Sequence, residues 1–137
     1  MVKGSFNNRR KEFYMNDIID VNQLKKLQQE FSDMRDWNKF HTPKNLAMAL
    51  TCESAELLEI FQWLTEEEAH LAHTDAKIKH KTSQELADIM LYLIRLADLM
   101  HINLNEAIHQ KLLDNHKKYP AELVKGSAKK YDEYFTD

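Results

Sequence analysis

Long stretches of the chain place apolar residues at every third or fourth position, and short polar segments separate them. The first stretch contains six apolar residues at this spacing, namely Ile18, Val21, Leu24, Leu27, Phe31 and Met34. This period is typical of an amphipathic helix and predicts a first helix over about 17–36. Three further stretches predict helices over about 43–64, 82–100 and 103–119.

Several residues have the character of helix caps. Thr42 precedes Pro43, and proline is well tolerated at the first position of a helix that begins after a threonine N-cap. The segment 65–68 (Thr-Glu-Glu-Glu) has the form of a capping box and predicts a short additional helix. Residues 73–81 are polar and rich in histidine and lysine, so we expect a loop or a frayed helix start there.

Glycine and proline are scarce, with two of each in 137 residues and neither between positions 44 and 119. A sheet protein needs turn residues at short intervals, so the fold class is predicted to be all-α. The length fits one domain with a core of its own. We expect 1–15 to be a disordered leader, with Met15 a candidate natural start, and 16–137 to be a single domain ending in a basic tail from about 119.

The composition argues against several classes of protein. A net charge of −3 gives no broad cationic field for nucleic acid. No apolar run approaches the roughly 18 residues of a membrane-spanning helix. Cys52 is the single cysteine and has no partner for an internal disulfide, so a reducing, cytoplasmic setting is expected.

Acidic residues interrupt the apolar face of the second predicted helix. Its apolar stripe consists of Leu46, Leu50, Leu57 and Leu64. Glu53 lies in the middle of this stripe and Glu56 at its edge. A carboxylate on a core-facing stripe is rare unless it is paired or binds a metal.

The third predicted helix carries a similar acidic flank. Glu85, Asp88 and Tyr92 are separated by three and four residues, which aligns them along one side of that helix. Two antiparallel helices would then present four carboxylates to one cleft, where they would repel one another strongly. A divalent cation relieves such repulsion, and hard oxygen ligands favour Mg²⁺ or Mn²⁺.

Simpler explanations remain open at this point. With 22 acidic residues in the chain, several pairs at this spacing arise by chance. Glu85 follows Thr82 by three residues and would complete a capping box there. Asp88 would equally form an ion pair with Arg95 or with a lysine.

The acidic motifs resemble a known family. Glu53-Ser-Ala-Glu56 is followed, after 28 residues, by Glu85-Leu-Ala-Asp88. Further matching blocks are 35–41 (RDWNKFH), 43–46 (PKNL), 56–63 (ELLEIFQW), 88–92 (DIMLY) and 111–120 (KLLDNHKKYP). Together, over roughly 20–135, they resemble the dCTP pyrophosphatase-like branch of the MazG-like all-α NTP pyrophosphatase superfamily.

The resemblance implies an enzyme that hydrolyses a nucleoside triphosphate, dCTP or a modified dCTP, to the monophosphate and pyrophosphate. It implies an antiparallel, four-helix bundle-like fold, assembled as a homodimer or homotetramer in which a neighbour helps to shape each pocket. The expected cofactor is Mg²⁺, with Mn²⁺ as a substitute, bound by Glu53, Glu56, Glu85 and Asp88. Glu56 and Glu53 are the expected catalytic residues, and by analogy Glu56 orients or deprotonates the attacking water.

The resemblance also assigns substrate contacts. The expected phosphate-binding residues, on one helix face, are Lys111, Asn115 and Lys118. The expected base-binding residues are Trp37, His41, Trp63 and Tyr92. The tail residues Lys129, Lys130 and Tyr131 would close over the triphosphate. The chain departs from some relatives at Gln28, where they carry a histidine, and this leaves the substrate preference open.

Each of these assignments has a simpler rival. The lysines also fit an exposed basic helix face, the aromatic residues an ordinary core, and His41 a helix boundary. The histidines at 70 and 73, or at 109 and 116, do not form a compact zinc ligand set. A non-catalytic helical oligomerisation module is the main alternative to an enzyme, because four amphipathic helices also suit a scaffold.

Overall fold

The computed structural model describes residues 19–134, which form helices and connecting turns without a strand. The elements are α2 (Val21–Asp33), α3 (Pro43–Phe61), α4 (Glu66–Leu71), η1 (Ala72–Thr74), α5 (Ala76–Leu99), α6 (Leu104–Lys118), α7 (Ala121–Val124) and η2 (Tyr131–Tyr134). This confirms the all-α prediction. The expected leader, 1–15, lies outside the described residues.

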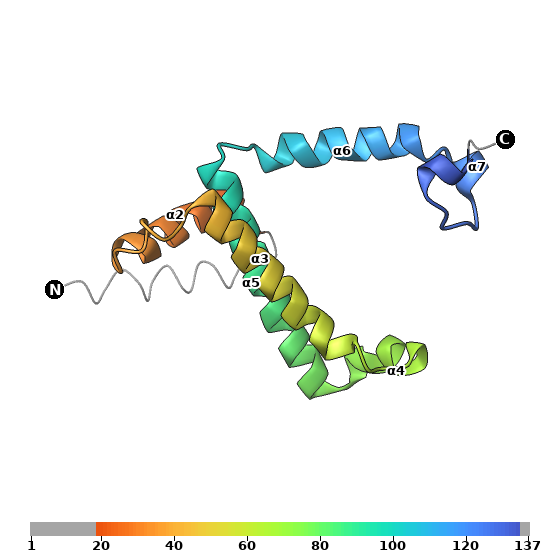
Figure 1. Cartoon of the computed structure of the whole chain (residues 1–137), viewed down its shortest axis with the longest axis horizontal. Helices are drawn as coiled ribbons and strands as arrows, with labels where there is room; N and C mark the ends of the chain where they lie inside the picture. The colour runs from red at the N-terminus through yellow and green to blue at the C-terminus, as the bar shows by residue number, and fades with distance from the viewer. Residues whose placement is uncertain (1–18, 135–137) are drawn as a thin grey trace.

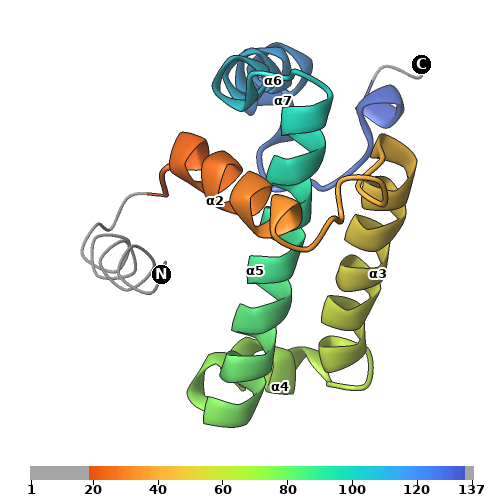
Figure 2. The ribbon, with the colours of Figure 1, turned by 90° about the vertical axis from the view of Figure 1, so that its left-hand side faces the viewer.

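The centre of the molecule is an antiparallel pair, α3 and α5, which lie side by side along their lengths (Figures 1 and 2). The side chain of Thr42 accepts a hydrogen bond from the amide of Asn45 at 3.2 Å, with Pro43 in the first turn. Both capping predictions for this helix are therefore confirmed. The short elements α4 and η1 form the turn between α3 and α5, and the predicted capping box of Thr65 and Glu68 opens α4.

Of the two alternatives expected for 73–81, a loop is wrong over most of the segment and a helix start is present, because α5 begins at Ala76. The side chain of Asp75 accepts hydrogen bonds from the amides of Lys77 and Ile78, at 2.8 and 2.9 Å, and so caps this start. As a result α5 is 24 residues long, and Thr82 lies inside it rather than at its beginning.

The other helix ends differ less from the sequence prediction. The helix α2 begins at Val21 rather than 17, because Asp20 caps it, and it ends at Asp33. The helix α3 ends at Phe61 rather than 64. The start of α6 after Asn103 and its end before Pro120 agree with the prediction.

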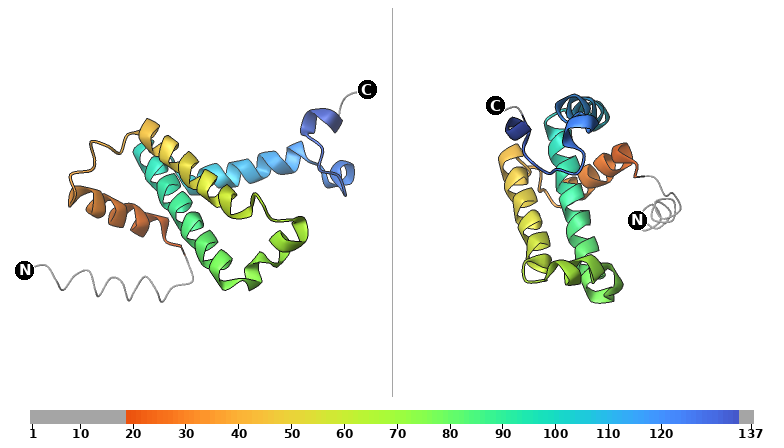
Figure 3. Two further views of the ribbon diagram at one scale, coloured as in Figure 1. Left: turned by 60° about the horizontal axis from the view of Figure 1, so that its bottom comes forward. Right: turned by 90° about the vertical axis from the view of Figure 1, so that its right-hand side faces the viewer.

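The remaining helices do not close over the central pair, because α2 packs across α5, and α6 and α7 lead away from that pair. Figure 2 shows α2 crossing α5, while Figures 1 and 3 show α6 running outward from the end of α5, with α7 beyond it. The four long helices therefore do not close into a bundle within one chain. None of the described helices is both long and apolar enough to cross a membrane.

Few apolar side chains are buried by this arrangement. Among the described residues the buried ones are Leu46, Ala72, Ile94 and Ala97. Large apolar side chains on every long helix are exposed, including Met48, Leu58, Leu86, Met90, Leu93, Ile108 and Leu112. The described chain thus has a thin core and extensive apolar faces on α3, α5 and α6.

Candidate active site

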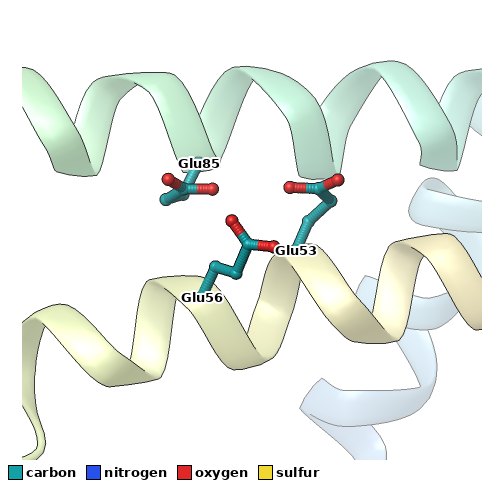
Figure 4. Close-up of side chains that lie close together, drawn as sticks. All are labelled: Glu53, Glu56 and Glu85. Atoms are coloured by element: carbon teal, nitrogen blue, oxygen red, sulfur yellow. The ribbon is translucent and has the colours of Figure 1, made fainter.

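Three carboxylates converge between α3 and α5. Glu53 and Glu56 come from α3 and Glu85 from α5, and one oxygen of each lies within 4.8 Å of the others. Figure 4 shows the three side chains directed into the space between the two helices. Glu53 and Glu85 are half-buried, whereas Glu56 is exposed.

Local sequence explains this convergence. Glu53 and Glu56 are three residues apart and so share one face of α3. Glu85 lies on α5, which runs antiparallel beside that face because α4 and η1 turn the chain back. The spacing thus predicts the pair on α3, and the turn brings the third carboxylate to it.

Charge and burial act together on Glu53. Its partial burial is the main cause that raises the pKa of this carboxyl above its ordinary value, and the charges of Glu56, Asp88 and Glu85 raise it further. Burial also raises the pKa of Tyr92, followed by the charges of Glu53 and Asp88. Asp88 and Tyr92 therefore lie within electrostatic reach of the cluster, although Asp88 is not a member of the group within 4.8 Å.

The two structural explanations for these acidic residues are contradicted. Thr82 lies inside α5, so Glu85 does not complete a capping box with it. Arg95 forms its ion pair with Asp98, at 3.6 Å, and not with Asp88. Within residues 19–134, no lysine or arginine forms an ion pair with any of the four predicted metal ligands.

The residues present fit a divalent cation. Carboxylate oxygens are the ligands that Mg²⁺ and Mn²⁺ prefer, and among the described residues no Lys or Arg side chain forms an ion pair with the cluster to offset its repulsion. In the described part of the chain, this is the only group of three or more His, Cys, Asp or Glu residues close enough to share an ion. The histidine pairs considered for zinc do not form such a group.

The predicted phosphate-binding residues lie elsewhere in this chain. The three residues Lys111, Asn115 and Lys118 are exposed on α6, which runs outward from the end of α5 (Figure 1). Within one chain, the fold does not bring this helix face to the carboxylates. Lys129 and Lys130 are exposed beyond it, and the side chain of Tyr131 lies outside the described part of the structure.

The predicted base-binding residues are also divided. Trp37 precedes α3 and makes edge-to-face contacts with Phe31 and His41, at centroid distances of 5.8 and 6.4 Å. Trp63 follows the other end of α3 and is 86% exposed. A helix of 19 residues is about 28 Å long, so these two indoles do not form opposite walls of one pocket within a single chain. Tyr92 is half-buried on α5.

One buried polar network was not predicted from the sequence. Arg95 is 2% exposed and Ser32 is fully buried, and both bond to the connection between α2 and α3. The sequence signal was available, because Arg95 interrupts an apolar run on α5 and a buried arginine needs partners.

Of the two amide atoms of the Gln28 side chain, one has a hydrogen-bond partner and the other has none among the described residues. Its Nε2 donates to the backbone carbonyl of Leu91 at 2.8 Å. Its Oε1 is buried and has no hydrogen-bond partner among the described residues. This unpaired acceptor therefore lies where α2 contacts α5.

The fold and this site define a class of protein: an all-α domain with acidic side chains gathered between two antiparallel helices for a divalent cation. A family model described as the MazG-like family matches residues 48–134. The chain therefore belongs to the MazG-like family. This match includes the whole acidic cluster.

Individual relatives agree with this assignment. The chain is 39% identical over 108 residues to mouse dCTP pyrophosphatase 1, covering 79% of this chain and 64% of the relative. It is 37% identical over 110 residues to the human dCTP pyrophosphatase 1, covering 80% and 65%. The chain thus spans somewhat less than two thirds of the length of these curated relatives. A solved structure of a pyrophosphatase from Archaeoglobus fulgidus is 40% identical, with a TM-score of 0.69 over 77% of this chain and 96% of that one.

Proposed function

We propose that this protein is a nucleoside triphosphate pyrophosphohydrolase that converts dCTP, or a modified dCTP, to the monophosphate and pyrophosphate. The observation that carries the proposal is the convergence of Glu53, Glu56 and Glu85 between α3 and α5. The names of the mouse and human relatives and of the archaeal structure support the reaction class.

The proposed cofactor is Mg²⁺, with Mn²⁺ as a substitute, held by the three clustered glutamates and Asp88. A bound divalent cation would offset the charge of the triphosphate and polarise its phosphorus–oxygen bonds. Glu53 and Glu85 are the half-buried members of the glutamate cluster. Glu56 is the exposed member, which water reaches most easily, so we assign it to orienting the attacking water and accepting its proton.

The hydrogen bonding of Gln28 supports the proposal that the base of the substrate carries an exocyclic amino group. The carbonyl of Leu91 accepts from Gln28 Nε2, and this leaves the buried Oε1 as the unpaired acceptor of the side chain. A buried acceptor gains a hydrogen bond from the amino group of cytosine but not from the carbonyl at the same position of uracil or thymine. The proposed preference is therefore dCTP over dUTP and dTTP.

A second copy of the chain is proposed to complete the site. The exposed apolar faces of α3, α5 and α6 require a cover, and α6 carries its candidate phosphate ligands away from the carboxylates of its own chain. A homodimer, or a homotetramer built from dimers, would cover these faces. It would also bring Lys111, Asn115 and Lys118 of one copy toward the carboxylates of another.

A pyrophosphate-release assay over ordinary and modified deoxynucleoside triphosphates tests the proposal. We expect release from dCTP with Mg²⁺ and none with a chelator. Glu53→Gln should abolish release with the helical content unchanged, whereas Glu59→Gln, the same change on an exposed part of α3, should retain it. A strong preference for a purine nucleotide would contradict the substrate assignment.

The exposed apolar faces also suit a non-catalytic oligomerisation module. That function predicts a stable oligomer with no pyrophosphate release from any nucleoside triphosphate in the presence of Mg²⁺.

The cytoplasm is the proposed location, because Cys52 is free and exposed and a reducing compartment preserves such a thiol.

A further inference from the structure

Arg95 connects α5 to the segment that joins α2 and α3. Its Nε donates to His41 Nδ1 at 3.3 Å and its Nη2 to Asn38 Oδ1 at 3.2 Å. Its Nη1 donates to Gln29 Oε1 at 2.7 Å. One buried side chain of α5 therefore holds the connection at two points just after Trp37.

The same connection is fixed from the side of α2. The fully buried Ser32 donates from Oγ to Asn38 Oδ1 at 2.8 Å, and its carbonyl accepts from the amide of Trp37 at 3.0 Å. The carbonyl of Trp37 in turn accepts from the amide of Phe40 at 2.9 Å. The backbone that carries the indole is thus held on both sides, and its orientation depends on the network.

Arg95 also determines which nitrogen of His41 carries the proton. A guanidinium has donors only, so His41 Nδ1 must be the acceptor, and the proton of the neutral ring must lie on Nε2. Burial and then the charge of Arg95 lower the pKa of His41 below its ordinary value, which favours the neutral ring. No described residue accepts a hydrogen bond from Nε2, which leaves an oriented donor next to Trp37.

We propose that Arg95 is a positioning residue for the nucleoside: it holds the connection so that Trp37 offers its ring face and His41 offers Nε2–H to an acceptor atom of the base. The inference rests on the proposed function, because it assumes a nucleotide substrate. Arg95 itself would touch no substrate atom. It would act through Trp37 and His41, which would contact the base.

Kinetics of Arg95→Lys with dCTP and Mg²⁺ test the proposal. Lysine keeps the charge but lacks the planar fork that bonds to His41 and Asn38 together. We expect KM to rise about tenfold while kcat changes less than about threefold. The matched control is Ile94→Val, which trims the fully buried neighbour on α5 and should leave KM unchanged. A folded Arg95→Lys protein with the KM of the wild type would overturn the proposal.

Two measurements do not depend on catalysis. Histidine ¹⁵N NMR of the wild-type protein, with His41 assigned by its loss in His41→Gln, should show the proton on Nε2; a proton on Nδ1 would overturn the proposal. With Trp63→Phe, Trp37 becomes the sole tryptophan, and Arg95→Lys should shift its emission.

The kinetic outcomes also separate this inference from the proposed function. A wild-type protein that releases no pyrophosphate contradicts both. An active wild-type protein whose KM is unaffected by Arg95→Lys contradicts the inference alone. The spectroscopic results then report whether the arginine holds the connection as described.

Discussion

In the metal-free protein Glu53 lies beside other carboxylates, so the ionised form of its side chain opposes folding. Its pKa is raised in the folded state, so the folded protein binds the proton more readily than the unfolded chain does. Ionisation therefore costs folding free energy, and this cost disappears as the pH falls through the folded-state pKa toward the ordinary value of 4.5. Glu53→Gln removes the charge with little change in shape, and we expect it to stabilise the metal-free protein.

The separation in the cluster sets the size of the effect. At 4.8 Å, two unit charges repel by about 1 kcal/mol in water and by about 3.5 kcal/mol at an effective dielectric constant of about 20. Glu53 is only half-buried, so we expect a gain of about 1–2 kcal/mol, or roughly 4–8 °C in melting temperature. The gain should shrink as the pH is lowered toward 4.5.

Added Mg²⁺ should make the wild-type protein more stable than Glu53→Gln, the reverse of the order without metal. A cation at one hundred times its dissociation constant stabilises the folded wild type by about 2.7 kcal/mol, whereas Glu53→Gln has lost a ligand and should gain little. The assay is thermal unfolding by circular dichroism, with chelator and with Mg²⁺, at several pH values. Glu59→Gln controls for loss of one negative charge elsewhere on α3. Two results would contradict a repulsive metal site at Glu53: Glu53→Gln no more stable than Glu59→Gln without metal, or Mg²⁺ stabilising Glu53→Gln as much as wild type.

Three other predictions concern Lys111, Gln28 and His41. Glu53→Gln should be inactive and Lys111→Ala weakly active, but co-expressed mixed oligomers of the two variants should regain pyrophosphate release if two copies share a site. The reason is that some sites then combine an intact Glu53 from one copy with an intact Lys111 from the other. No restoration would place both residues in one chain's site. Gln28→Leu should lower the preference for dCTP over dTTP about tenfold in kcat/KM, and an unchanged ratio would remove this residue from base recognition. Because the pKa of His41 is lowered, first by burial and then by Arg95, its contribution to stability is full above pH 6.5 and declines below it as the unfolded chain takes up the proton. Chemical denaturation between pH 7 and 5 should therefore show a shallower acid loss in His41→Gln than in wild type.

The helices were predictable where a cap and an apolar period agreed. Thr42 with Pro43, the capping box at Thr65, and Asn103 all mark helix starts that the structure confirms. The sequence does not locate the start of α5, because its first turns are mostly polar and exposed and Ile78 is their only half-buried apolar residue. Asp75 was the available signal, since its side chain caps the helix regardless of which residues follow.

The parts of the site formed by residues close together in the sequence were predictable, and the parts formed by distant residues were not. Glu53 and Glu56 share a helix face by spacing alone, and the turn between α3 and α5 adds Glu85. The network of Arg95 joins residues separated by 54 to 66 positions, and no helical period relates such distant residues. Only the tertiary packing of α2 on α5 brings them together.

The acidic cluster and the apolar faces are connected energetically. The repelling carboxylates lower the stability of a chain that buries few apolar side chains, so one copy alone has little to offset them. Association would bury apolar surface on α3, α5 and α6, and metal binding would neutralise the cluster, so each should favour the folded state independently. Because a shared site would couple the two, Mg²⁺ with nucleotide should tighten the oligomer as well as raise its melting temperature. Sedimentation velocity at falling protein concentration, with and without these ligands, would measure that coupling directly. An oligomer that dissociates at the same concentration in both conditions would show that the site lies within one chain.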